Sequence, residues 1–422
     1  MDNTPRGFRL HLGIFGRRNV GKSSLLNALT RQKTSIVSDI AGTTTDPIEK
    51  PMELLPIGPV LFIDTAGIDD QGSLGQLRIQ KTLQVFDRTD IGLLVVDVSR
   101  GNQSNDEIWG EFENQIVHEL KKRKTPLLIV LNKVDLAPVP EDLIQKLQLW
   151  HLPFVKTSTK ETSNSSGLLE NDIIDIREAL VQIVPDEYLT PPPIVSDLLD
   201  PNELAILVVP IDKEAPKGRL ILPQVQTIRD ILDGDQACLV VKENFLADVL
   251  KRCNPAPKLV ITDSQAFHNV AKIVPNSIPL TSFSILFARQ KGNLTTMVAG
   301  ARTLGSLKPK SKVLIAESCS HHPINDDIGT EKIPRWLRKF VDDSLTIAHI
   351  QGHDFPTTTS ELAQWDIVIH CGACMWNRRE MLQRIARCVE AGVPITNYGL
   401  AIAFLNGILD RALQPFMQKN LH

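Results

Sequence analysis

The 422-residue sequence lacks any apolar run near the roughly 18 residues needed to span a bilayer, and runs such as Ile91 to Val96 are much shorter. It also lacks the basic and then apolar layout of a secretory signal at Met1 to Arg6. Its 46 Lys and Arg residues nearly balance 49 Asp and Glu residues, so no charge excess attracts nucleic acid or an anionic membrane. We therefore expect a cytoplasmic protein with neither nucleic acid nor membrane as a partner.

Length and composition predict a folded protein of several domains. Hydrophobic residues make up 42% and charged residues 23%, which is typical of soluble globular chains. Domains of roughly 150 residues would give about three in a chain of this length. The six cysteines, in a reducing cytosol, are more consistent with metal ligands or buried thiols than with disulfides.

Short apolar runs alternate with helical patterns, which predicts an α/β fold of three domains. Prolines at 191–193 predict a stiff extended linker. The predicted domains are residues 1–187 with a mainly parallel sheet, a small unit at 196–274, and 275–422. The predicted strands are 9–15, 60–63, 92–96, 127–131, 154–156, 205–209, 237–241, 259–262, 312–316, 346–350 and 367–370. The predicted helices follow Gly21, begin near Ser104, and cover 224–232, 281–290, 294–304 and 332–342.

A phosphate-binding loop is predicted between the first strand and the first helix. Residues 16–23 match G-x-x-x-x-G-K-[ST], with Gly16 and Gly21 at the two glycine positions. The glycines allow backbone N–H groups to surround phosphates, and the start of the following helix, where Ser24 lies, favours their charge. Lys22 is expected to contact the β- and γ-phosphates, and Ser23 to bind Mg2+.

Two further motifs follow predicted strands. Asp64 and Gly67, in Asp-Thr-Ala-Gly, are expected to hold the Mg2+ shell and to contact the γ-phosphate. Asn132, Lys133 and Asp135 form N-K-x-D, whose carboxylate can accept hydrogen bonds from N1–H and the 2-amino group of guanine. Adenine offers neither donor, so the pattern predicts GTP and GDP rather than ATP. An isolated N-K-x-D also occurs in solvated turns, but here it follows two other motifs in order.

The motifs together resemble the TrmE and Era type of translation-factor-related GTPases. The resemblance implies that Thr44, in Gly42-Thr43-Thr44, completes the Mg2+ shell, and that Asn19 helps to hold K+. Ile68 occupies the position at which Ras-like proteins carry a water-positioning glutamine, so slow hydrolysis that K+ stimulates is expected. Ser158, within Thr-Ser-Thr, is expected to contact the base.

The third predicted domain contains a cysteine and histidine pattern. Cys319 and His321 follow one predicted strand, and His370, Cys371 and Cys374 follow another, with 48 residues between the two histidines. The carboxyl ends of strands in an open α/β sheet can face one crevice, and C-x-x-C allows two thiolates to bind one metal centre. The ligand types fit a structural zinc site and an iron–sulfur cluster equally well, while reactive or buried thiols are a third interpretation.

The combination of this GTPase region with C-x-H and H-C-x-x-C resembles the HydF family of maturation GTPases for FeFe-hydrogenase. Residues 209–223 are also similar to that family. The resemblance implies a 4Fe-4S cluster held by Cys319, Cys371 and Cys374, with one iron open to an exchangeable ligand. His321 or His370 would cap that iron, or orient a thiolate.

The same resemblance implies a scaffold that carries a diiron unit with CO and cyanide ligands. Radical-SAM maturases would supply this cargo and apo FeFe-hydrogenase would receive it, with GTP hydrolysis as a timing switch. A homodimer through the middle domain, or a higher oligomer, is expected. The alternative is a zinc-containing GTPase of RNA modification or ribosome assembly, which is the more common work of G-T-T GTPases. It predicts a basic RNA-binding patch, but the sequence has only short basic clusters such as 121–124, which also suit a solvated helix end, and the net charge is negative.

Overall fold

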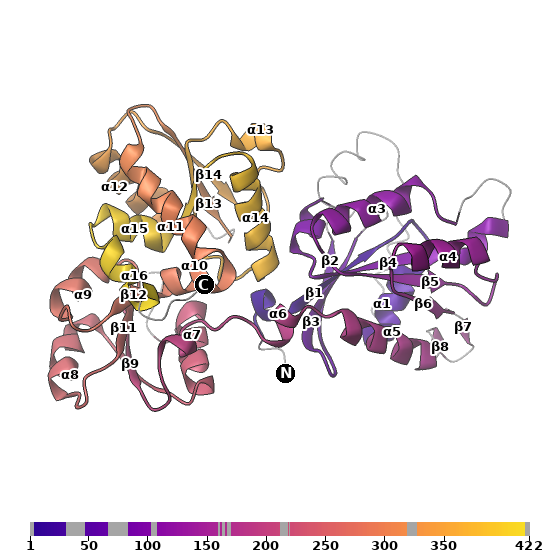
Figure 1. The fold of residues 1–422 in the computed structure, drawn as a ribbon, viewed down its shortest axis with the longest axis horizontal. Coiled ribbons are helices and arrows are strands. Elements are labelled where there is room, and N and C mark those ends of the chain that lie inside the picture. The colour runs from indigo at the N-terminus through magenta and orange to yellow at the C-terminus, as the bar shows by residue number, and fades with distance from the viewer. Residues whose placement is uncertain are drawn as a thin grey trace. The chain divides into compact units, whose positions relative to one another are not determined.

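The computed structural model describes residues 4–30, 47–65, 83–102, 108–158, 161–162, 165–166, 170–211, 218, 220–318 and 327–417. The chain forms two compact units, residues 1–191 and 192–422 (Figure 1). The break between them lies at Pro191 and Pro192, inside the predicted proline linker.

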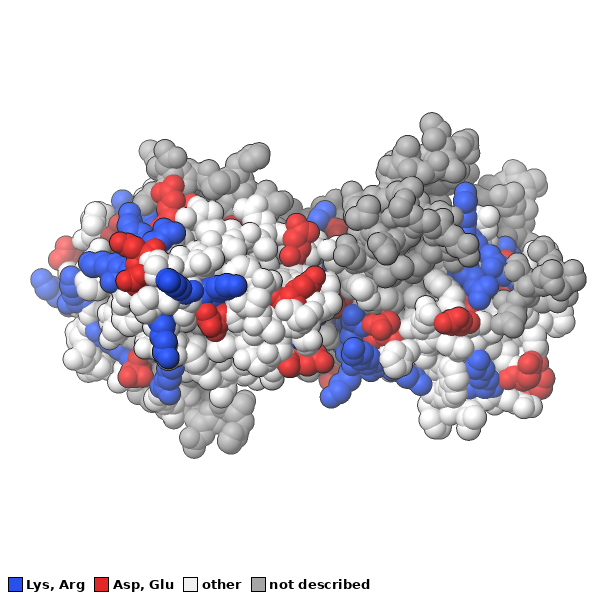
Figure 2. Space-filling model, turned by 90° about the horizontal axis from the view of Figure 1, so that it is seen from above, with Lys and Arg blue, Asp and Glu red and all other residues white. Residues whose placement is uncertain are grey.

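None of the described helices has the length and apolar character needed to cross a membrane. On the face shown in Figure 2, acidic and basic side chains intermingle over the described surface.

The first unit is built on a six-stranded sheet with the order β2-β3-β1-β4-β5-β6. All neighbours pair in parallel except β2, which is antiparallel to β3. The strands are β1 (Leu10–Phe15), β2 (Ile48–Leu54), β3 (Gly58–Asp64), β4 (Ile91–Asp97), β5 (Leu127–Asn132) and β6 (Phe154–Thr157), and a separate hairpin is formed by β7 (Glu161–Thr162) and β8 (Ser165–Ser166).

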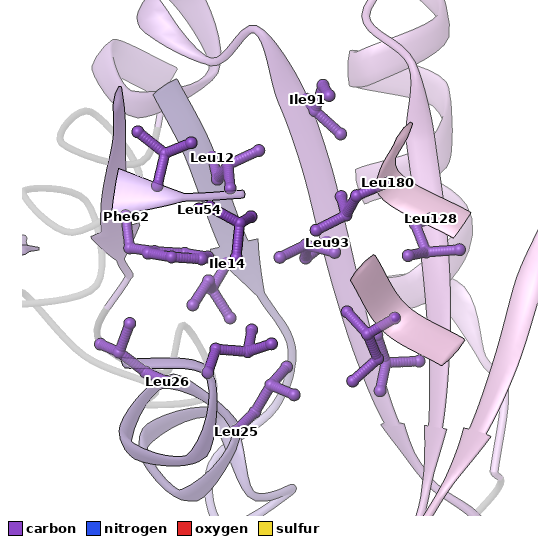
Figure 3. Packing of buried hydrophobic residues seen from close by; sticks show 14 of the residues in the cluster. Leu12, Ile14, Leu25, Leu26, Leu54, Phe62, Ile91, Leu93, Leu128 and Leu180 are labelled. Atoms are coloured by element: carbon purple, nitrogen blue, oxygen red, sulfur yellow. The ribbon is translucent and has the colours of Figure 1, made fainter. Parts of the chain in front are cut away.

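Helices cover both faces of this sheet, which explains why its central strands are apolar along their whole length. They are α1 (Lys22–Thr30), α3 (Glu111–Lys122), α4 (Glu141–Leu149), α5 (Glu170–Ile183) and the short α6 (Asp186–Leu189), with 3-10 turns η1 (Arg6–Phe8) and η2 (Val98–Asn102). On one face, side chains of α1 and α5 pack with alternate residues of the strands (Figure 3). On the other face, α3 and α4 pack against the intervening residues.

Helix α3 begins later than the sequence predicted. The expected start at Ser104 lies outside the described residues, and the helix itself begins at Glu111. The backbone N–H of Gly110 donates to the Glu113 carboxylate at 2.8 Å, which caps this end. The first turn also carries two acidic residues, which the helix dipole stabilises.

The second unit contains two four-stranded sheets, each entirely parallel. The first, in the order β10-β9-β11-β12, consists of β9 (Leu204–Val208), β10 (Ala237–Val241), β11 (Leu259–Thr262) and β12 (Leu280–Ser282). The second, in the order β14-β13-β15-β16, consists of β13 (Lys312–Glu317), β14 (Thr346–Gln351), β15 (Ile367–His370) and β16 (Ile395–Asn397). The first sheet continues beyond the predicted domain boundary at 274, because β12 pairs with β11.

Helices connect and cover these strands. Around the first sheet lie α7 (Leu222–Asp233), α8 (Leu246–Arg252), α9 (Phe267–Ile273) and the turns η3 (Ser196–Leu198) and η4 (Glu243–Phe245). The others are α10 (Phe283–Lys291), α11 (Leu294–Thr303), η5 (Leu304–Ser306), the π-helix η6 (Ile328–Lys332), α12 (Ile333–Phe340), α13 (Thr359–Leu362), α14 (Arg378–Glu390), α15 (Tyr398–Leu405) and α16 (Leu409–Met417). The fold is therefore α/β throughout, with a mixed sheet followed by two parallel ones.

Candidate functional site

The predicted phosphate loop connects β1 to α1 in the first unit. Gly16 has a φ of 146°, and a Cβ at this position would lie 2.5 Å from the Val95 carbonyl oxygen, so only glycine fits. Gly21 has a φ of 99°, and Asn19 between them has a φ of 63°. Asparagine tolerates this left-handed conformation better than most residues. The loop backbone is thus specified by the residues that the motif requires.

Lys22 is held inside this loop. Its Nζ donates to the carbonyl oxygens of Gly16 and Arg17, both at 2.8 Å. The side chain is buried, while Ser23 and Ser24 in the first turn of α1 are exposed. A buried ammonium next to the free N–H groups of a helix start suits binding of phosphate groups.

Asp64 ends β3 beside the same loop. Its side chain is 8% exposed, and burial raises the pKa of this carboxyl, although Lys22 and Ser23 oppose the rise. Oδ2 accepts a hydrogen bond from Ser23 Oγ at 3.3 Å, whereas Oδ1 is buried with no hydrogen-bond partner among the described residues. Oxygen atoms in this arrangement are of the kind that Mg2+ prefers as ligands. Thr44 and Gly67 lie outside the described residues.

The N-K-x-D segment follows β5 and binds the phosphate loop directly. Asn132 Nδ2 donates to the Val20 carbonyl at 2.8 Å. Lys133 Nζ donates to the Asn19 carbonyl at 3.0 Å and to Asp97 Oδ2 at 2.6 Å. The structure therefore brings together two motifs that are more than a hundred residues apart, as the GTPase interpretation requires.

Asp97, at the end of β4, was not singled out from the sequence. Burial alone would raise the pKa of its carboxyl, but hydrogen bonds from Lys133 and Ser99 lower it overall. The Ser99 backbone N–H and hydroxyl donate to Oδ1 at 3.0 and 2.6 Å. The Asp97 carboxylate thus stays charged and pairs with Lys133. In the sequence, only its position at the end of a predicted strand could have indicated that it contacts the nucleotide motifs.

The remaining base-contacting candidates lie on the same edge of the sheet. Asp135 is exposed. Ser158 follows β6, and its backbone N–H donates to Asp172 Oδ2 at 2.8 Å. Its hydroxyl is buried, and no hydrogen-bond partner for it lies within the described ranges. Thr157 Oγ1 donates to Asn132 Oδ1 at 3.1 Å, which joins this segment to N-K-x-D.

In the second unit, Cys371 directly follows β15 next to the end of β13. Its backbone N–H donates to the Ala316 carbonyl at 2.8 Å. Its Sγ lies 3.1 Å from both the backbone nitrogen and the hydroxyl of Ser318. Burial raises the pKa of the thiol, and the Ser318 hydrogen bonds oppose this. The backbone N–H donates to the sulfur, and the hydroxyl can donate to it once the thiol is ionised, which is the arrangement that a metal-bound thiolate needs.

His370 is fully buried, and each ring nitrogen faces a protein group. Nδ1 lies 2.9 Å from the Cys371 carbonyl oxygen, and Nε2 lies 3.0 Å from Arg384 Nη1. Because a carbonyl only accepts and a guanidinium only donates, Nδ1 carries the hydrogen. Burial and Arg384 lower the pKa of His370 to about 3. Of the two roles that the resemblance implied for His370, this geometry favours orienting the Cys371 segment over capping an iron.

Arg384 of α14 was not indicated by any motif. The guanidinium packs over the rings of Trp376 and Phe355, at 3.9 and 4.6 Å from their centroids, and Nη2 donates to the Gly352 carbonyl at 2.8 Å. It thereby fixes His370 and the loop that follows it.

The other predicted ligands, Cys319 and His321, lie outside the described residues. Within the described ranges, no three His, Cys, Asp or Glu side chains lie close enough together to hold a metal ion. His370, Cys371 and Cys374 are the described part of the predicted set. Among the other cysteines, Cys388 is buried, and burial raises its pKa to about 12. Cys238 and Cys253 are only half-buried.

A cavity of about 200 Å³ opens beside Cys374. Its walls come from residues that follow β11, β12, β15 and β16, together with the starts of α7 and η6, so the carboxyl ends of strands from both sheets border it. The lining residues are Ile221, Pro223, Asp263, Ser264, Gln265, Phe283, Ser284, Phe287, Ile328, Gly372, Cys374, Tyr398 and Ile402. The size and mixed lining suit a small ligand.

Three family models match consecutive parts of the chain. Residues 11–133 match the 50S ribosome-binding GTPase family. Residues 194–292 match the hydrogen maturase F dimerization domain, and residues 295–415 match the hydrogen maturase F tetramerization domain.

The relatives found among curated proteins share only part of the chain. GTPase Der of Nitratiruptor sp. is 41% identical over 131 residues, which are 30% of this chain and 27% of that protein. The tRNA modification GTPase MnmE of Carboxydothermus hydrogenoformans is 46% identical over 124 residues, 29% of this chain and 25% of that protein. The chain thus spans about a quarter of the length of these relatives. An Aquifex aeolicus Era variant bound to GDP and AlF4− aligns at 25% identity with a TM-score of 0.33, covering 42% of this chain and 56% of Era.

The matches to the two maturase domains occupy the second unit, and the GTPase match occupies the first. The order of these three matches along the chain agrees with the positions of the motifs, because the nucleotide motifs lie in the first unit and the C-x-x-C loop lies in the second. The chain therefore belongs to the HydF hydrogen maturase family, as a GTPase domain followed by the dimerisation and tetramerisation domains of that family.

Proposed function

We propose that this protein hydrolyses GTP and serves as a scaffold for the assembly of the FeFe-hydrogenase metal site. It would bind a 4Fe-4S cluster, receive a diiron precursor with CO and cyanide ligands from radical-SAM maturases, and deliver it to apo FeFe-hydrogenase. The observation that carries the proposal is the Cys371–Cys374 loop at the edge of a cavity, on a chain that also has the three nucleotide motifs in contact.

The GTP site would work through charge and position. Lys22 and the start of α1 would bind the β- and γ-phosphates, and Ser23 and Asp64 would hold Mg2+, which neutralises charge that develops on the phosphates. Asn19 is exposed and its carbonyl already accepts from Lys133, so its side chain is available to hold K+. We infer slow hydrolysis that K+ stimulates, with Thr44 and Gly67 responding to the γ-phosphate.

The cluster site would use Cys319, Cys371 and Cys374, with His321 near the open iron and His370 as an orienting residue. The described thiols fit such a group because the Ser318 backbone N–H and hydroxyl both lie 3.1 Å from Cys371 Sγ and can donate to a thiolate, and because Cys374 lines a cavity. A cluster bound through three thiolates supplies one iron at which an exchangeable ligand can bind. The cavity lies where such a ligand would be received.

We further propose that the protein is a homo-oligomer, which the dimerisation and tetramerisation domains support. The edge strand β10 is the proposed dimer surface. Leu239 and Val240 on this strand are 41% and 45% exposed, and Val225 and Leu232 of α7 are also exposed. An open strand edge with apolar side chains is suited to pairing with the same strand of a second copy.

The cluster is tested by anaerobic reconstitution of the full chain with iron and sulfide, followed by metal analysis and EPR of the reduced protein. The wild type is expected to hold about four irons, as one 4Fe-4S cluster requires. Cys371→Ser should lose the cluster, and Cys253→Ser, which removes a half-buried thiol at the end of α8, should retain it. A colourless protein with one tightly bound zinc would overturn the proposal and would favour the RNA-directed GTPase, which is the activity in the name of the MnmE relative.

A further inference from the structure

Ser284, in the first turn of α10, lines the cavity beside the C-x-x-C loop. Its Oγ lies 3.7 Å from the position that a Cβ of Gly372 would occupy, so the hydroxyl faces this loop. The residue is half-buried, in agreement with its place on the cavity wall. No motif in the sequence distinguishes this serine from its neighbours.

Both acceptor positions of this hydroxyl are used. Ser284 Oγ accepts from Asn397 Nδ2 at 3.2 Å and from the backbone N–H of Gly399 at 3.1 Å. Glycine at 399 is required for this contact, since a Cβ there would lie 2.7 Å from Ser284 Cβ. A serine hydroxyl has two acceptor positions and one hydrogen to donate. Across the described part of the chain, that hydrogen has no protein acceptor.

The surroundings of the hydroxyl favour an electron-rich acceptor. The helices α7, α10 and α15 each contribute residues of their first turn to the cavity, namely Pro223, Ser284 and Tyr398. The starts of helices carry partial positive charge. Asp263 is the acidic residue in the wall, and its Oδ2 accepts from Gln224 Nε2 at 2.8 Å.

We propose that Ser284 is a positioning residue that donates a hydrogen bond to the iron group bound at Cys374. The acceptor is an electron-rich atom of that group, either a cluster sulfur or the nitrogen of a cyanide on the diiron cargo. This inference rests on the proposed function, because it requires an iron–sulfur group at this loop. Ser284 would supply the hydrogen-bond donor that adjusts the reduction potential of the iron–sulfur group or holds its cyanide ligand in the cavity.

Ser284→Ala removes the donor, and Ser264→Ala is the matched control. Ser264 also lines the cavity, but its hydroxyl donates to Ser282 Oγ at 3.3 Å, so its hydrogen is already used. The wild type and both variants are reconstituted anaerobically as full chains. Iron content, the thermal unfolding midpoint and the reduction potential of the cluster are measured. A synthetic diiron complex with CO and cyanide ligands is then bound, and the cyanide stretching frequencies are recorded.

We expect Ser284→Ala to retain the iron of the wild type and to have a more negative reduction potential, because a donor to a cluster sulfur stabilises the reduced form. If the acceptor is cyanide instead, the potential stays constant and the cyanide bands shift in this variant. Either result, with Ser264→Ala unchanged, supports the inference. Unchanged potential and bands in Ser284→Ala, equal changes in both variants, or loss of iron from Ser284→Ala would overturn it. A wild type that binds no cluster would instead overturn the proposed function.

Discussion

At the scale of single residues, both candidate sites hold polar groups that folding alone does not satisfy. Considering only the described part of the chain, Asp64 is buried with one oxygen unpaired, and Ser284 has a hydroxyl hydrogen without an acceptor. Such groups cost stability unless a ligand satisfies them. His370 is the opposite case, since both ring nitrogens have partners. These differences separate residues that would bind a ligand from residues that position others.

Asp64→Asn is expected to stabilise the nucleotide-free first unit while it weakens binding of Mg2+ and GTP. Burial raises the pKa of this carboxyl, so its charged form is unfavourable in the folded state at neutral pH. Removing the charge should raise the free energy of unfolding by about 1 kcal/mol. Thermal unfolding without nucleotide and titration with GTP at fixed Mg2+ measure the two effects. A variant that is less stable than the wild type and binds GTP equally well would contradict this role.

The iron-free second unit should lose stability as the pH falls below about 6.5, in part through His370. The folded pKa of His370 is about 3, against an ordinary value of 6.5. Below 6.5 the unfolded chain therefore binds a proton that the folded chain cannot, and the contribution of this one group falls by about 1.4 kcal/mol for each pH unit. Urea unfolding between pH 7 and pH 4.5 measures the slope. His370→Gln should have a shallower slope, and identical slopes would show that His370 does not titrate in this way.

At the scale of helices and strands, most of the second-unit strands and the central strands of the first were predictable, because they are apolar runs of four or more residues between helical patterns. β2 was missed because it contains Pro51 and polar residues, which an edge strand tolerates. The short strands β12 and β16 have three residues each, too few for a periodic pattern.

The sequence indicated the candidate residues that lie in contiguous motifs, as in residues 16–23 and in Cys371 and Cys374. Asp97, Arg384 and Ser284 were not predictable, because only the folded chain brings them to these motifs. Asp97 follows a predicted strand and Ser284 lies in a predicted helix, whereas α14, which carries Arg384, was not among the predicted helices. Tertiary contacts, rather than local propensity, give these residues their roles.

The contact between the phosphate loop and N-K-x-D gives a prediction at this scale. Asp97→Asn should weaken binding of GTP and of GDP about tenfold, because the variant loses a charge-assisted hydrogen bond to Lys133 worth roughly 1.5 kcal/mol. The two nucleotides should be affected equally, since N-K-x-D is proposed to bind the guanine base that GTP and GDP share. Fluorescent-nucleotide titration measures both dissociation constants. Ser99→Ala, which leaves Lys133 paired, should have a smaller effect, and unchanged constants in Asp97→Asn would contradict the prediction.

At the scale of the whole molecule, the proposed assembly depends on the exposed edge of the first sheet in the second unit. Leu239→Lys should shift the protein toward smaller species, because a charge at an apolar edge opposes pairing of strands. Light scattering after size-exclusion chromatography measures the mass. Leu149→Lys, an exposed leucine on α4 of the first unit, is the control and should leave the mass unchanged. An unchanged mass for Leu239→Lys would place the dimer surface elsewhere.

In the proposed function, a GTP site and a cluster site on one chain serve the delivery of a metal precursor. The measurement that tests this most directly is activation of purified apo FeFe-hydrogenase, followed by hydrogen evolution. The protein is first produced together with the radical-SAM maturases and then isolated anaerobically. We predict that the wild type and Cys253→Ser activate the hydrogenase and that Cys371→Ser does not. Equal activation by Cys371→Ser would contradict the account, because delivery would then proceed without the proposed cluster ligand.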